Sequence, residues 1–169
     1  QEEDMMTREN LEPATLGHLL DQAITAFPDN DAVVYADRDF RLTYREFGDM
    51  VDSLAKGLMA LGVEKNEKVA VWATNVPYWV VLQFATAKIG AIMVCINPAY
   101  RLFELEYALN KVECKAIVAA EKFKTSHYLK MLGELAPELN HCDPGKLVSK
   151  KLPHLSTVIR MGDTTTPGM

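Results

Sequence analysis

Few residues of this sequence combine a reactive type with a spacing that could do chemistry. His, Cys and Asp, types that serve nucleophilic catalysis, stand side by side at residues 141–143. Consecutive side chains point in different directions, and Pro-Gly follows at 144–145, so we interpret this cluster as a loop. His18 lies three residues before Asp21 on an expected helix, where we interpret it as a surface histidine. We therefore expect none of these groups to be catalytic.

A glycine-rich phosphate loop is also missing. Nucleotide-binding α/β domains usually carry G-x-G-x-x-G or G-x-x-x-x-G-K-[ST] after their first strand, because small residues let backbone N–H groups reach phosphates. Neither pattern occurs, and the turn after Trp72 reads Ala-Thr-Asn-Val-Pro, in which Pro77 lacks a donor. Residues 162–169, Gly-Asp-Thr-Thr-Thr-Pro-Gly-Met, contain no lysine, and we interpret them as a surface loop.

Charge and composition exclude several classes of partner. The 169 residues include 23 acids and 18 bases, giving a net charge of −5, and 49% of them are hydrophobic, enough for a buried core. Five acids and one base fall within residues 1–12, which we interpret as a solvated acidic tail before a domain over residues 13–169. The domain is then close to neutral, so we expect no binding to nucleic acid.

The cysteines and the N-terminus favour an intracellular protein. The three cysteines match neither a disulfide framework nor a zinc pattern, and we expect no metal site: Cys95, Cys114 and Cys142. Cys95 lies in an apolar run, where we expect a buried thiol. The acidic start resembles no secretory or transit signal, which favours the cytoplasm, with the mitochondrial matrix as the alternative if a native N-terminus is missing. Residues 78–96 are mostly apolar, but Lys88 interrupts them, so we expect no transmembrane segment.

Hydrophobic periodicity predicts alternating helices and strands. Apolar residues at helical spacing or in short β-type runs indicate the following elements. The expected helices are 15–27, 44–61, 77–89, 102–112 and 125–139, and the expected strands are 32–35, 40–43, 68–73, 91–96, 116–120 and 157–160. The first two strands read as a hairpin around residues 37–39. Thr43 and Glu46 have the spacing of a capping box, which should start the second helix.

The later elements predict a parallel sheet. Residues 68–96 read as strand, helix and strand, a unit in which the two strands run parallel. We expect Val71 and Val94 to be buried on these neighbouring strands, and Thr125 to cap the last helix. The fold class is therefore α/β, with a mostly parallel sheet, flanking helices and an early β-hairpin.

Several collinear motifs carry a resemblance to a known family. They are Glu67-Lys-Val-Ala-Val-Trp-Ala-Thr-Asn-Val-Pro-Tyr-Trp79, Ala87-Lys-Ile-Gly-Ala91, Asn97-Pro-Ala-Tyr-Arg101 and Glu104-Leu-Glu-Tyr-Ala-Leu109. In this order they resemble the N-terminal portion of the adenylate-forming, AMP-binding enzymes. The motifs at 97–101 and 104–107 point to the fatty acyl-CoA synthetase branch. The stretches 144–147, 152–155 and 157–159 are similar to medium-chain synthetases related to acyl-CoA synthetase family member two.

The resemblance implies a two-step ligase whose chain is longer than this one. ATP and a fatty acid give an acyl-adenylate and pyrophosphate with Mg²⁺, and coenzyme A then displaces AMP. In the family, the phosphate loop, the magnesium-site acid and the catalytic lysine lie beyond the region matched here. The chain therefore resembles a fragment that is incomplete relative to the full enzyme, holds no catalytic residue and is expected to be inactive alone, binding no cofactor. A scaffold module of the same fold, or an aryl-CoA ligase, stays open as an alternative.

Only Arg101 carries a family role over to this sequence. In some relatives a basic residue just after Asn-Pro lies near the phosphates of coenzyme A, and a guanidinium suits phosphate by its paired donors. The alternative is a surface arginine, or one paired with Glu104 on a solvated helix face. We expect Asn97 and Pro98 to shape the turn between strand and helix. Because the rest of the enzyme is missing, apolar surface should stay uncovered, which would favour a homo-oligomer.

Overall fold

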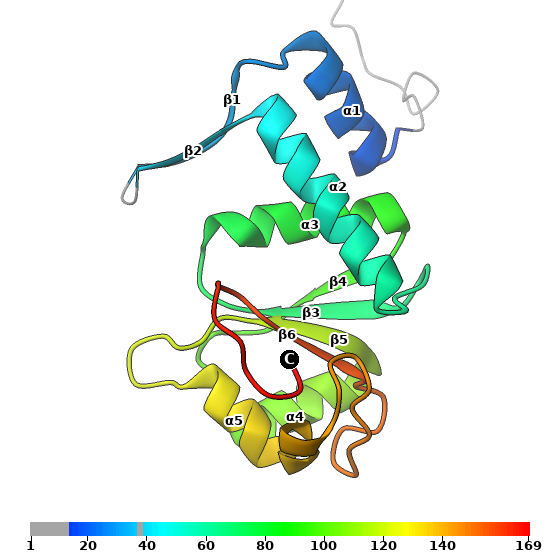
Figure 1. The fold of residues 1–169 in the computed structure, drawn as a ribbon, viewed down its shortest axis with the longest axis vertical. Helices are drawn as coiled ribbons and strands as arrows, with labels where there is room; N and C mark the ends of the chain where they lie inside the picture. The colour runs from blue at the N-terminus through cyan, green and yellow to red at the C-terminus, as the bar shows by residue number, and fades with distance from the viewer. Residues whose placement is uncertain (1–13, 37–38) are drawn as a thin grey trace, which may run out of the picture.

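The computed structural model describes residues 14–36 and 39–169, and its centre is a four-stranded parallel sheet (Figure 1). The acidic tail expected at 1–12 and most of the hairpin turn expected at 37–39 lie outside the described residues. The strand order is β4-β3-β5-β6, and each neighbouring pair is parallel. The strands are β3 (Lys68–Trp72), β4 (Ile92–Cys95), β5 (Cys114–Ala119) and β6 (Thr157–Arg160). This arrangement confirms the predicted α/β class.

Helices cover both faces of the sheet (Figure 1). On one face lie α1 (Leu16–Ala26), α2 (Tyr44–Ala60) and α3 (Pro77–Ile89), and on the other lie α4 (Leu102–Lys111), α5 (Tyr128–Leu135) and the 3₁₀ helix η3 (Pro137–His141). The strands β1 (Asp31–Tyr35) and β2 (Phe40–Thr43) form a separate antiparallel hairpin. No helix in the described part of the chain is long and apolar enough to cross a membrane.

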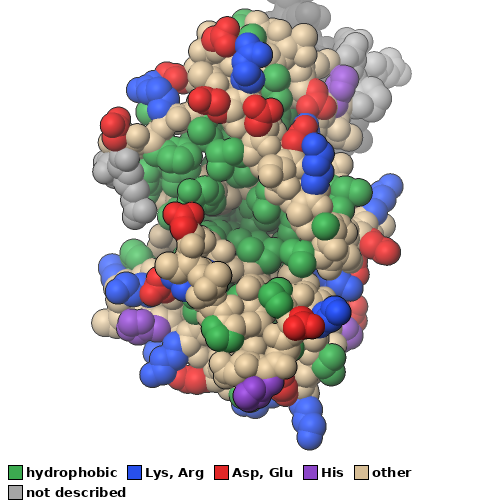
Figure 2. Space-filling model, viewed as in Figure 1, with side chains coloured by type: hydrophobic (Ala, Val, Ile, Leu, Met, Phe, Trp, Pro, Cys, Tyr) green, Lys and Arg blue, Asp and Glu red, His purple; other side chains and the backbone are tan. Residues whose placement is uncertain are grey.

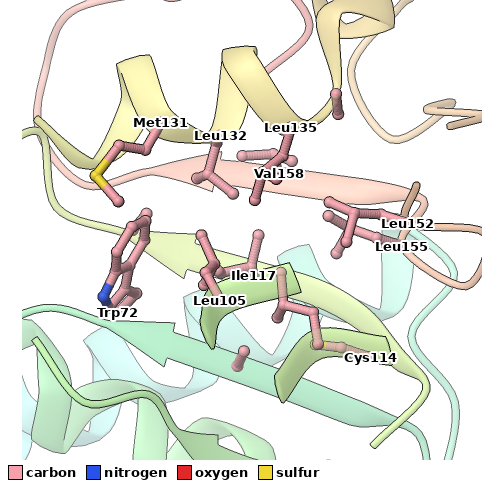
Figure 3. Close-up of a cluster of buried hydrophobic side chains, with 14 of the residues drawn as sticks. Trp72, Leu105, Cys114, Ile117, Met131, Leu132, Leu135, Leu152, Leu155 and Val158 are labelled. Carbon is pink, nitrogen blue, oxygen red and sulfur yellow. The ribbon is translucent and has the colours of Figure 1, made fainter. Parts of the chain in front are cut away.

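Alternation along the strands creates two hydrophobic clusters. In β3, Ala70 and Trp72 face α4 and α5, whereas Val69 and Val71 face the layer of α1, α2 and α3. Figure 3 shows the first cluster, in which Trp72 and Ile117 of the sheet meet leucines of α4 and α5. The pairing of β3 with β5 shifts between Lys68 and Val69, so that β5 contains one extra residue opposite β3. The same strands therefore contribute side chains to both clusters.

The structure confirms the predicted capping box at the start of α2 and the predicted bounds of α3. Thr43 Oγ1 accepts a hydrogen bond from the Glu46 N–H at 3.3 Å, and Glu46 Oε2 accepts one from the Thr43 N–H at 2.8 Å, which confirms the capping box. The hydrogen bonds that the Thr43 N–H and the Thr43 hydroxyl donate to Glu46 Oε2 hold the pKa of Glu46 below its usual value. Gly62 follows α2 with a φ of 81°, in the left-handed region that glycine adopts readily. The helix predicted at 77–89 has the same bounds as α3.

An ion-paired lysine joins the first three helices. Lys88 Nζ, on α3, lies 2.7 Å from Oδ1 of Asp21 on α1 and 2.7 Å from Oδ1 of Asp52 on α2. The Lys88 side chain is 18% exposed, whereas both carboxylates are about half exposed. Burial lowers the pKa of Lys88, but the bonds and charges of the two aspartates outweigh this effect and raise it above its usual value.

Three local predictions were wrong. The strand at 91–96 is not fully buried, because β4 is an edge strand; Val94 is half-buried, whereas Val71 on the neighbouring parallel strand is buried as expected. Cys95, at the end of β4, is exposed for the same reason. Thr125 does not cap a helix: α5 starts only at Tyr128, because Phe123 and Ser126 bond to each other through their backbones and form a turn.

Candidate functional site

The connection that follows β3 leaves the sheet on a different face from the connections that follow β4 and β5. Strands β3 and β5 are neighbours, but β3 leads into α3 on one face and β5 leads into α5 on the other. The loops that leave their carboxyl ends therefore separate (Figure 1). In open α/β sheets ligands bind in the crevice that such a divergence creates. The topology thus places the candidate site at this edge.

A crevice of about 730 Å³ lies at this edge. It is built from the residues that follow all four parallel strands, with one tyrosine of the β1–β2 hairpin as a side wall. We call it the carboxyl-edge crevice; its lining residues are Tyr35, Thr74, Asn75, Val76, Pro77, Tyr78, Pro98, Ala120, Glu121, Lys122, Phe123, Met161 and Gly162. Aromatic and apolar side chains alternate with polar ones, which suits an amphipathic ligand.

The crevice contains an acid that is already paired. Glu121 Oε2 accepts a hydrogen bond from Arg160 Nη2 at 2.7 Å. Arg160 also donates through Nη1 to Thr166 Oγ1 at 2.9 Å, and its side chain is only 17% exposed. This carboxylate therefore holds the end of β6 in place rather than standing ready as a general base. Among the described residues, no three His, Cys, Asp or Glu side chains gather in a way that could hold a metal ion.

Two buried aromatic rings fix the turn after β4. Trp72 Nε1 donates to the Asn97 carbonyl oxygen at 3.2 Å, and the Tyr128 hydroxyl donates to the Pro98 carbonyl oxygen at 2.9 Å. The two rings pack with their centroids 4.2 Å apart, and burial raises the pKa of Tyr128. Asn97 Oδ1 accepts from the Ala99 N–H at 2.9 Å, which is a side-chain turn. Asn97 and Pro98 therefore shape the turn, as the sequence indicates.

Arg101 stands at the end of this turn and is exposed. Its backbone N–H donates to Glu104 Oε2 at 3.1 Å, whereas its guanidinium Nη1 donates to Ser126 Oγ at 3.0 Å. The guanidinium is thus held toward the loop after β5 by a neutral partner, and its charge stays available to an anion.

Sequence reasoning missed a histidine and a lysine beside Arg101. Arg101, His127 and Lys130 line one cavity of about 340 Å³, together with Glu134. The expected helix from residue 125 hid this arrangement, because it placed His127 and Lys130 on a regular helix with no link to Arg101. The lysines at residues 122, 124 and 130 were the available signal.

The other residues considered from the sequence lie elsewhere. His18 is exposed on α1 and shares a hydrogen bond of 3.1 Å with Gln22. His141 ends η3 and is exposed, and Cys142 follows it half-buried. Neither histidine lines the carboxyl-edge crevice. The structure therefore brings none of them together into a nucleophile–base pair.

A four-stranded parallel sheet with helices on both faces and a crevice at its carboxyl edge defines an α/β domain with a candidate site at this edge. The model of the AMP-binding enzyme family matches residues 20–161. The chain belongs to this family of AMP-binding enzymes.

Sequence relatives specify the branch of the family. The medium-chain acyl-CoA ligase ACSF2, mitochondrial, of Danio rerio is 42% identical over 158 residues, covering 94% of this chain and 26% of that protein. YngI of Bacillus subtilis is 42% identical over 156 residues, covering 92% of this chain and 28% of that protein. The chain thus spans about a quarter of the length of these relatives.

Solved structures share the fold. A fatty acyl-CoA synthetase of Mycobacterium tuberculosis superposes with a TM-score of 0.71 at 23% identity, covering 86% of this chain and 26% of that one. At this identity the likeness shows the architecture alone. It agrees with an N-terminal portion of a longer AMP-binding enzyme, as the collinear motifs indicate.

Proposed function

We propose that this chain is the N-terminal part of an AMP-forming fatty acyl-CoA synthetase. The longer protein joins ATP and a fatty acid into an acyl-adenylate with release of pyrophosphate, and coenzyme A then attacks the acyl carbon while AMP leaves. The observation that carries the proposal is the 42% identity to a medium-chain acyl-CoA ligase over nearly the whole chain. A carboxylate is a poor electrophile, and the mixed anhydride with AMP supplies a leaving group.

The described residues support a binding role for this part and favour a location of the adenylation chemistry outside it. Adenylation needs a cradle for the triphosphate, Mg²⁺ and a carboxylate in line. The carboxyl-edge crevice offers no unpaired carboxylate cluster for the metal, since Glu121 bonds to Arg160 and the described chain gathers no metal-binding set. We therefore assign adenylation to segments of the longer protein and expect the 169-residue chain to be inactive alone.

ATP–pyrophosphate exchange tests this proposal. The longer protein should catalyse exchange with octanoate and should form the thioester when coenzyme A is added. The 169-residue chain should show no exchange with short, medium or long acids, because the missing groups act as a unit. An inactive longer protein would favour the scaffold alternative, and exchange with benzoate but no fatty acid would favour the aryl-CoA ligase.

We also propose that Arg101 contacts the phosphates of coenzyme A. Lys130 shares its cavity, together with His127 and Glu134, and the two basic side chains of Arg101 and Lys130 support an anion as the ligand. In the longer protein Arg101→Ala should raise the KM for coenzyme A roughly 10- to 100-fold, the loss of one charge-assisted bond, without changing ATP–pyrophosphate exchange. Lys111→Ala, an exposed cation at the other end of α4, is the matched control. An unchanged KM for coenzyme A would return Arg101 to a surface role.

Self-association of the isolated chain is a further proposal. A groove of about 390 Å³ between α2 and α3 is lined almost entirely by apolar atoms, from Met50, Ser53, Leu54, Gly57, Tyr78 and Val81. Figure 2 shows hydrophobic side chains gathered in a hollow on this face of the molecule. Such surface favours association. Sedimentation at high concentration should show oligomers that Leu54→Glu reduces; a monomer throughout would contradict this.

For the compartment we propose the cytoplasm, with the mitochondrial matrix as the alternative. The mitochondrial relative supports the second compartment. Fractionation of cells that express the complete native protein distinguishes the two compartments.

A further inference from the structure

The β1–β2 hairpin is attached at two points to the segment after β3, once in the loop and once in the first turn of α3. The Tyr35 hydroxyl donates to the Asn75 carbonyl oxygen at 2.7 Å, across 40 residues of sequence. The ring of Phe40 packs edge-on against that of Tyr78, with centroids 6.2 Å apart. Tyr35, Asn75 and Tyr78 all line the carboxyl-edge crevice. One wall of the crevice therefore depends on where the hairpin lies.

Apolar packing also holds the hairpin, since Ala32, Val33 and Leu42 lie against the cluster of the α1–α3 layer. The hairpin forms its own two-stranded sheet, which does not join the four-stranded one. Two-stranded hairpins are marginally stable by themselves, so their contacts with the rest of a protein fix them. The base of the hairpin is held at α2, where the Tyr44 N–H donates to the Asn30 carbonyl oxygen at 2.9 Å. Tyr35 supplies a side-chain hydrogen bond from the hairpin to the crevice.

The bonded carbonyl controls the local backbone. A peptide group is planar and trans, so the direction of the Asn75 carbonyl also sets the direction of the Val76 N–H. Val76 precedes Pro77, the first residue of α3, and its carbonyl accepts from the Trp79 N–H at 2.9 Å. The Tyr35 hydroxyl thus acts on the segment that connects β3 to α3 within the crevice.

We infer that Tyr35 is a positioning residue of the carboxyl-edge crevice. Its hydroxyl sets the conformation of residues 73–77 and thereby how well the crevice fits its ligand. The kinetic consequence rests on the proposed function, because it requires that a substrate of the longer protein occupies the crevice. The effect on the backbone does not rest on it.

Amide hydrogen exchange tests the backbone effect in this chain. Tyr35→Phe removes the hydroxyl and keeps the ring that forms the wall. Exchange at the amides of residues 74–79 should become roughly three- to tenfold faster, the worth of one hydrogen bond, while the amides of β5 and α5 keep their protection. Tyr107→Phe, an exposed tyrosine on α4, should change neither set. Equal exchange in wild type and Tyr35→Phe, or faster exchange throughout the chain, would overturn the inference.

Kinetics of the longer protein distinguish positioning from general damage. Tyr35→Phe should raise the KM for one of octanoate, ATP or coenzyme A roughly three- to tenfold, with kcat changed less than twofold. A lower kcat with all three KM values unchanged would indicate a loss of folded enzyme and would overturn the positioning role. If the wild-type longer protein forms no thioester, the proposed function fails, and the exchange experiment still decides the role of Tyr35.

Discussion

The two faces of the sheet are covered to different degrees. On the α4–α5 face, η3 and residues 142–155 add further cover, and Leu139, Leu147, Leu152 and Leu155 are all at least 95% buried. On the α1–α3 face, many apolar side chains at the margin of the cluster stay partly exposed, among them Leu54, Trp79 and Met161. Figure 2 shows the apolar hollow, and Figure 3 shows the buried cluster of the α4–α5 face.

This contrast distinguishes a filled layer, in which the apolar side chains are buried, from an open layer, in which many of them stay partly exposed. A filled layer loses packing and gains a cavity when a side chain is shortened, whereas a partly exposed layer loses little. The open face is also the one that holds the groove proposed for self-association. Stability measurements on paired variants therefore test the comparison directly.

The largest expected effect is on the filled face. Leu132→Ala on α5, where the side chain is 0% exposed, should lower the free energy of unfolding by about 2–5 kcal/mol. Leu54→Ala makes the same change on α2, where the leucine is partly exposed, and should cost about 1 kcal/mol. Both residues lie inside helices, so helix propensity cancels. Urea unfolding measures both, and equal losses would break the comparison.

An intermediate effect is expected at the lysine that joins the open layer. Lys88→Met removes both ion pairs and should cost about 1–2 kcal/mol at pH 7, because the lysine is largely buried but its partners are not. Since the pKa of Lys88 is raised in the folded state, this stabilisation is complete below the unfolded pKa and is lost as the pH rises through the folded value. Measured by urea unfolding, the loss of stability caused by Lys88→Met should therefore be smaller at strongly alkaline pH than at pH 7.

The exposed Lys56 on α2 provides the control for this experiment. Lys56→Met should change the free energy of unfolding by less than about 0.5 kcal/mol at either pH. A loss in Lys56→Met as large as that in Lys88→Met would show that net charge, not the ion pairs of Lys88, is responsible.

A smaller effect is expected at the start of α2. Thr43→Ala removes the N-cap and should lower the free energy of unfolding by about 1 kcal/mol. Because the Thr43 bonds lower the pKa of Glu46, their stabilisation is present above the unfolded pKa of Glu46 and is lost as the pH falls through the folded value. Thermal unfolding at neutral and acidic pH measures this. Ser53→Ala, a control substitution within α2, should not show this pH-dependent loss of stability.

The smallest effect on stability is expected at the cysteines, although their reactivities should differ greatly. Cys95 is exposed on the edge strand, whereas burial raises the pKa of Cys114 to about 12. Only about one part in 10⁴ of the Cys114 thiol is ionised at pH 8, so it should not react with a thiol reagent until the chain unfolds. Cys95→Ser should remove the fastest reaction and change stability by less than about 0.5 kcal/mol. If the fast reaction persists in Cys95→Ser, another cysteine is responsible for it.

The sequence predicted the interior of the fold better than its margins. Strand and helix at 68–89 were predictable because Val69 and Val71 lie in a short apolar run and Pro77 marks a helix start. The exposure of Cys95 was not, because an apolar run does not say whether a strand is central or at an edge. Edge position is decided by strand order, which depends on contacts distant in sequence.

The candidate site was predictable only at its turn. Asn-Pro at 97–98 is a local signal, and the structure has the turn. The crevice and the cavity at Arg101 combine segments that lie far apart in sequence, such as Tyr35 with Asn75 and Arg101 with Ser126. No periodicity or spacing within one segment reports such contacts.

The extra residue in β5 changes which side chains of this strand point to which face of the sheet. In an uninterrupted strand, residues an even number apart share a face, yet Cys114 and Ile117 lie in one cluster and Ala116 in the other. The bulge at Lys115 thus reverses the inside–outside sense of the strand once along its length. Deleting Lys115 would remove the bulge and make Cys114 and Ala116 consecutive, so that Cys114 would stay in the cluster of Ile117 and the pairing of β3 with β5 would become continuous. At this position a single-residue deletion is therefore compatible with both clusters, whereas a deletion in the regular part of β5 would turn the residues on one side of it to the opposite face.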